Sequence, residues 1–254
     1  MTMAKKVIVE VCVDSVASAR AAERGGAQRV ELCGDLLEGG ITPSLGLIAV
    51  VRSRISIGLH LIIRPRPGDF CYSDEEFESM QRDIEFAKAQ GADGAAVGIL
   101  HPDGSVDIPR TRALVELARP MSVTFHRAFD LSADPLRALE DVCATGADRI
   151  LTSGGEQQCV KGIPAISQLV KSARGRTIIM AAGGIRIHNV AAIVHETAVS
   201  EIHVGLAVPV SSSVPRQTSR RLSVGKVDKH EFQRTQVREE DVRDLIRAIS
   251  AGTA

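Results

Sequence analysis

Two cysteines stand at the ends of short apolar segments, and their spacing is the first chemical signal in the chain. Cys12 closes the segment VIVEVC and Cys33 closes the segment QRVELC. Adjacent strands lie about 4.8 Å apart, so thiols at the ends of two neighbouring strands can approach each other. Paired thiolates suit a soft ion such as Cu(I). The pattern indicates a candidate Cu(I) site at Cys12 and Cys33; the alternative is that both pack as small hydrophobic side chains.

Ionisable side chains alternate with apolar ones in the same segments. Apolar strand residues would face covering helices, which leaves the polar ones facing the interior. The inward set is Glu10, Glu31, Arg64, His126 and His203, with Cys12 and Cys33 nearer the mouth. Carboxylate and imidazole groups gathered at strand ends are typical of a catalytic or binding site. The alternative is an ion network that only stabilises the fold.

Two loops carry groups suited to anions. The segment RPRPGDF begins at Arg64, and Arg127 follows His126 directly. Guanidinium donors match carboxylate and phosphate oxygens. Gly183 and Gly184 follow the seventh apolar segment, where many barrels bind phosphate on backbone N–H groups. A tight turn explains the glycine pair equally well.

Strand-like and helix-like segments alternate along the whole chain. Strands are predicted at 7–12, 28–33, 58–64, 93–100, 121–126, 148–153, 177–182 and 201–206. Helices are predicted at 15–24, 44–54, 74–90, 108–118, 135–145, 160–174, 187–196 and 239–250. Eight such units in about 250 residues predict an α/β fold, a (β/α)8 TIM barrel. A doubly wound sheet is the alternative, but no G-x-G-x-x-G follows the first strand, and we expect no nucleotide cofactor.

Local signals place the helix starts and one departure from the repeat. Thr42-Pro43 and Asp134-Pro135 each read as a capping residue before a first-turn proline, and Ser73 with Glu76 has capping-box spacing. The Ser-rich, basic segment 209–236 is predicted to be an irregular insertion over the barrel mouth or against a neighbouring subunit. The helix at 239–250 then closes a single domain spanning 1–254.

The composition excludes several classes of partner. Lys and Arg number 31 and Asp and Glu number 31 in 254 residues, so neither nucleic acid nor an anionic membrane surface is an expected partner. Aromatic residues are 3% and Trp is absent, which argues against a base-stacking platform. No apolar run reaches the roughly 18 residues of a membrane span. Five cysteines without regular spacing, and no secretory signal, predict a cytoplasmic protein with reduced thiols.

Seven segments, in order, resemble the copper homeostasis protein CutC family. They are EVC at 10–12, VELC at 30–33, EGGITPS at 38–44, IRPRPGDF at 63–70, VTFHRAFD at 123–130, RILTSG at 149–154 and EIH at 201–203. The resemblance implies a TIM barrel, a cytoplasmic role in copper handling, a homo-oligomer, and Cys12 and Cys33 as Cu(I) ligands. It implies no reaction, so whether the protein is an enzyme is left open.

Two other functions remain open beside copper binding. The inner charges exceed what a copper dithiol needs, which favours a barrel enzyme acting on a small anionic molecule. In that case Arg64 and Arg127 would hold the anion, and Glu10, Glu31 and His126 would share acid–base roles. The third possibility is a structural protein whose polar interior only specifies the barrel.

Overall fold

Eight parallel strands close into a barrel in the computed structural model, which describes residues 7–211 and 233–252. The strands follow one another in chain order, and the last pairs with the first. They are β1 (Ile8–Val13), β2 (Arg29–Leu32), β3 (Gly58–Ile62), β4 (Gly94–Val97), β5 (Ser122–Phe125), β6 (Arg149–Thr152), β7 (Ile178–Ala182) and β8 (Glu201–Val204). The predicted (β/α)8 barrel is confirmed.

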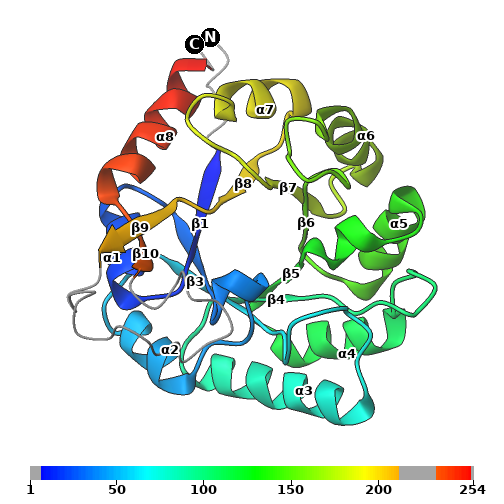
Figure 1. Cartoon of the computed structure of the whole chain (residues 1–254). Coiled ribbons are helices and arrows are strands. Elements are labelled where there is room, and N and C mark those ends of the chain that lie inside the picture. The colour runs from blue at the N-terminus through cyan, green and yellow to red at the C-terminus, as the bar shows by residue number, and fades with distance from the viewer. Residues whose placement is uncertain (1–6, 212–232, 253–254) are drawn as a thin grey trace, which may run out of the picture.

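Helices surround the barrel on all sides (Figure 1). They are α1 (Val16–Arg24), α2 (Leu45–Arg52), α3 (Asp74–Ala89), α4 (Ile108–Ala118), α5 (Pro135–Thr145), α6 (Ile163–Ala173), α7 (Val190–Thr197) and α8 (Glu239–Gly252). Short 3-10 helices, η1 (Leu36–Glu38) and η2 (Arg127–Leu131), follow β2 and β5. Outward strand residues such as Val11, Val30 and Leu59 are fully buried in the core. Their burial against this layer leaves the alternate, polar positions to the barrel interior.

The helix starts follow the predicted capping signals with one exception. Ser73 and Glu76 form a full capping box, and Asp134 accepts hydrogen bonds at the start of α5. The cap predicted at Thr42 is wrong, because α2 begins at Leu45 and its N-cap is Ser44. The Thr42 hydroxyl instead accepts a hydrogen bond from the Arg64 N–H at 3.0 Å. Thr42 therefore ties its loop to the end of β3 rather than starting a helix.

The ends of the segment 209–236, predicted to be irregular, are ordered as strands. β9 (Ala207–Ser211) and β10 (Gln233–Val237) pair in antiparallel register. The Val237 N–H donates to the Ser18 hydroxyl of α1 at 3.1 Å, and this contact fixes the ribbon on the barrel's side. Figure 1 shows β9 and β10 beside α1. Residues 212–232, the middle of the predicted insertion, lie outside the described residues.

A network of ion pairs fills the N-terminal end of the barrel. Arg29, the first residue of β2, pairs with both Glu10 and Glu201. Arg149, the first residue of β6, pairs with the same Glu201 at 3.0 Å. All four side chains are buried. Mutual neutralisation is what makes their burial tolerable, since an unpaired buried charge costs several kcal/mol.

We predict that Arg29→Met lowers the free energy of unfolding by about 3 kcal/mol, because it leaves buried carboxylates short of a counterion. Urea unfolding followed by circular dichroism measures the change. The control is Arg24→Met, which removes the half-exposed pair with Glu239 and should cost less than about 1 kcal/mol. Equal losses in the two variants would contradict a stabilising role for the buried network.

Candidate functional site

The two predicted thiols meet at the C-terminal end of the barrel. Cys12 is in β1, opposite Glu31 in the parallel register, and Cys33 comes directly after β2. Their sulfur atoms are 3.7 Å apart. Gly40 packs over Cys33 with a φ of 91°, and a Cβ there would lie 3.3 Å from the sulfur. The loop after β2 therefore needs glycine to cover the cysteine pair.

A charged pair lies directly below the thiols. The Nδ1 atom of His203 is 2.7 Å from a Glu10 carboxylate oxygen, and its Nε2 atom is 4.0 Å from Glu31. Burial opposes protonation of His203, but hydrogen bonds to Cys12 and Glu10 raise its pKa well above the ordinary value. Burial likewise opposes ionisation of Glu10, yet Arg29 and His203 hold the pKa of that carboxyl below its usual range. The pair is an imidazolium and a carboxylate.

The pKa of Cys12 is lowered in this environment, whereas the pKa values of Cys33 and Glu31 are raised. A hydrogen bond from Cys33, helped by His203, lowers the pKa of Cys12 to about 6. The same hydrogen bond and burial raise the pKa of Cys33 well above its ordinary value. Burial, together with the charges of Glu10 and Cys12, raises the pKa of Glu31 to about 8. At neutral pH the site therefore holds one thiolate, one thiol and a protonated carboxyl.

The predicted polar residues line one cavity above the thiols, which we call the mouth cavity. Its volume is about 110 Å³, and it is lined by Cys12, Glu31, Gly39, Ile62, Arg64, Phe70, His126, Arg127, Leu151 and His203. Five of the six residues predicted as catalytic candidates thus share this space: Glu31, Arg64, His126, Arg127 and His203. The sixth, Glu10, does not line it and reaches it only through its bond to His203.

The two arginines of the mouth cavity are held differently. Arg64 donates to the backbone carbonyls of Glu38, Gly40 and Gly68 at 2.8 to 2.9 Å. It therefore joins the loops after β2 and β3. Arg127 begins η2, since β5 ends at Phe125, and its guanidinium bonds Asp130 at 2.7 Å. Consecutive residues of a strand point to opposite faces, so Arg127 would point away from the cavity if β5 continued. Because β5 ends before it, Arg127 can line the same cavity as His126.

His126 is deeply buried in the wall of the mouth cavity. Its ring lies against β4's end, where a Cβ on Gly98 would come within 2.5 Å of the ring atoms. The Phe70 ring covers it, with centroids 4.9 Å apart. Only glycine at position 98 leaves room for this imidazole.

Sequence reasoning missed two residues that organise the site. Arg149 alternates with Ile150 as the other inward residues do, so the same parity rule identifies it. Asp130 has no such signal, because it lies in η2, outside the strands. Its carboxylate accepts from the Thr152 hydroxyl at 2.5 Å and the Ser153 N–H at 3.0 Å, which joins the loops after β5 and β6.

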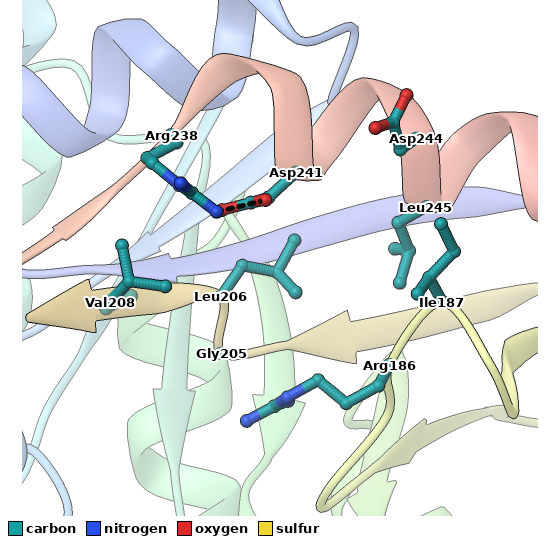
Figure 2. Close-up of a pocket in the computed structure, with 10 residues that line it drawn as sticks. Arg186, Ile187, Gly205, Leu206, Val208, Arg238, Asp241, Asp244 and Leu245 are labelled. Atoms are coloured by element: carbon teal, nitrogen blue, oxygen red, sulfur yellow. Dashed lines mark hydrogen bonds and ion pairs between the residues drawn. The ribbon is translucent and has the colours of Figure 1, made fainter.

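The glycine pair after β7 lies apart from the mouth cavity. Gly183 accepts a hydrogen bond from the Cys159 N–H at 2.8 Å, and neither Gly183 nor Gly184 lines that cavity. Beyond them, Arg186 lines a second pocket between the β8–β9 connection and α8 (Figure 2). The Arg238 charge in this pocket is paired with Asp241 at 2.7 Å. Anion binding by the glycine pair stays a prediction.

The fold and this site define a class: (β/α)8 barrels with a polar centre at the carboxyl ends of their strands, where barrel proteins bind ligands. Residues 7–208 match the model of the CutC family, and the chain belongs to that family. None of the described helices is long and apolar enough to cross a membrane.

Similar proteins align with most of the chain. A mouse copper homeostasis protein cutC homolog is 50% identical over 196 residues, which are 77% of this chain and 72% of the mouse protein. A CutC family protein of Chromobacterium violaceum is 44% identical over 95% of this chain and 98% of its own length. The crystal structure of a CutC protein from Streptococcus agalactiae superposes with a TM-score of 0.74 at 31% identity, over 78% of this chain and 97% of that chain.

We predict that Cys12 is alkylated by iodoacetamide with a rate that rises through pH 6 and is level above it, because the thiolate is the reactive form. Mass spectrometry of the modified peptides gives the rate at each cysteine. Cys71 is the internal control, since burial and Asp69 raise its pKa and its rate should still be rising at pH 8. Identical pH profiles for the two thiols would refute the assigned thiolate.

Proposed function

We propose that this protein binds Cu(I) through Cys12 and Cys33 and acts in copper homeostasis in the cytoplasm. The observation that carries the proposal is the approach of two reduced sulfurs to 3.7 Å at the barrel mouth. The copper role of the named mouse relative supports it. The ion would be cargo held by the thiols rather than a group needed for folding.

The chemistry of the donors favours Cu(I) over harder ions. Among the described residues, one set of close ligand atoms is Cys12, Glu31 and Cys33, and a second is Glu10, Glu31 and His203. In the second set, Glu10 and His203 already neutralise each other, which leaves the sulfur set more available. Cu(I) prefers soft thiolates, whereas structural zinc sites usually use four cysteine or histidine ligands.

The state of the other cysteines supports a reducing compartment. Cys71, Cys143 and Cys159 are free thiols as well. Unpaired cysteines are typical of cytosolic proteins. Assembly into a homo-oligomer stays a prediction of this proposal.

We expect anaerobic Cu(I) titration against a competing chelator to show that the wild type binds one ion and that Cys12→Ser/Cys33→Ser loses this site. Serine oxygen is a poor ligand for Cu(I), so the lost affinity should exceed about tenfold. The matched control is Cys71→Ser/Cys143→Ser, which removes two thiols outside the cluster and should bind as the wild type does. Unchanged stoichiometry and affinity in the first variant would exclude the proposed ligands.

A second candidate function is catalysis on a small anionic molecule. The mouth cavity supports it, because Arg64, His126 and the protonated Glu31 carboxyl line the same space as Cys12. No reaction is assigned. A ligand-bound crystal structure tests the idea: an anion between Arg64 and His126 supports it, and binding elsewhere counts against it.

A further inference from the structure

We propose that the mouth cavity binds the carboxylate group of a small organic acid, held by the Nε–H of Arg64 and the Nε2–H of His126. The inference deepens the second candidate function by naming its ligand class, and it does not depend on copper. It rests on two buried N–H groups that have no partner among the described residues.

The first unpartnered donor is on His126. Its Nδ1 accepts a hydrogen bond from the Ala128 N–H at 3.2 Å. A neutral imidazole that accepts at Nδ1 carries its proton at Nε2. Burial and the Arg64 charge lower the pKa of His126 to about 3, which agrees with a neutral ring. The Nε2–H is thus a donor in a side chain only 3% exposed, and it lacks an acceptor.

The second unpartnered donor is on Arg64. The terminal nitrogens of its guanidinium donate to three backbone carbonyls, but among the described residues no acceptor meets its Nε–H in hydrogen-bond geometry. The Tyr72 hydroxyl lies beside the same guanidinium and also lacks a full hydrogen bond. Arg64 is 6% exposed, and its guanidinium is held by neutral backbone carbonyls rather than by a carboxylate. A buried cation that is hydrogen-bonded but not neutralised is costly, and a bound anion supplies the missing charge.

Charge and shape together favour a monocarboxylate. The other cations of the mouth cavity, Arg127 and the His203 imidazolium, are already paired with Asp130 and Glu10, so only the charge of Arg64 awaits a ligand. Two N–H donors match the two oxygens of a carboxylate, whereas a phosphate dianion usually requires more donors and more charge. Phe70 lies 5.1 Å from the Arg64 guanidinium carbon and also covers His126. With Ile62 and Leu151, it gives a short carbon chain an apolar wall.

Acetate is the probe for this site, with inorganic phosphate as the competing anion, and calorimetric titration of the copper-free protein measures both affinities. We expect acetate to bind and His126→Asn to weaken it about tenfold or more, the usual effect of losing one hydrogen bond to a charged group. Asparagine retains a group near the Nδ1 position, which can still accept from Ala128, but loses the Nε2 donor. His126→Gln places an amide N–H near the Nε2 position and should restore binding to within about threefold.

Three results would overturn the inference: no acetate binding to the wild type, equal affinity in His126→Asn, or tighter binding of phosphate than of acetate. Thermal unfolding of both His126 variants establishes that each is folded. Cys12→Ser/Cys33→Ser separates this site from the copper proposal, since it should lose Cu(I) and keep acetate. Loss of acetate binding in a folded dithiol variant would also contradict the assignment to Arg64 and His126.

Discussion

Each charge buried inside this barrel must be compensated, and that requirement accounts for the arrangement of the interior. The barrel's outer faces are filled by valine, leucine and isoleucine packed against helices, so its ionisable side chains must lie inside. There the dielectric is low, and each charge requires an opposite charge or a hydrogen bond. The interior meets this requirement in its lower layer, the ion pairs of Arg29 and Arg149. It leaves the requirement incomplete in its upper layer, around Arg64 at the mouth.

The lower layer transmits its charge to the thiols. Arg29 and Arg149 neutralise Glu201, and Arg29 keeps Glu10 ionised. Glu10 in turn favours protonation of His203, which stabilises a thiolate on Cys12. The ion network and the cysteine site are therefore one electrostatic system. The inner charges are therefore neither purely structural nor purely functional, because the same groups act in both ways.

The upper layer is where compensation is incomplete. Arg64 is bound by three carbonyl oxygens that position it without neutralising it. The same bonds join two loops at the mouth, so the cation also shapes the cavity it lines. A fold that otherwise pairs its inner charges has kept an open position in the cavity that Cys12 also lines, as expected of a site that receives a ligand.

The barrel and the inward set can be predicted from the amino-acid sequence, because alternation along a strand decides which face each side chain occupies. Parity was enough to bring Cys12, Glu31 and His203 together. The interactions among those groups emerge only in the folded protein, since pairing and proton positions depend on distances between strands far apart in the chain. Asp130 and Thr42 show the same limit: their partners lie on other loops, and no local pattern names them. The strands at 207–211 and 233–237 were not predicted for the same reason. They form by pairing with each other, and they are far apart in the sequence.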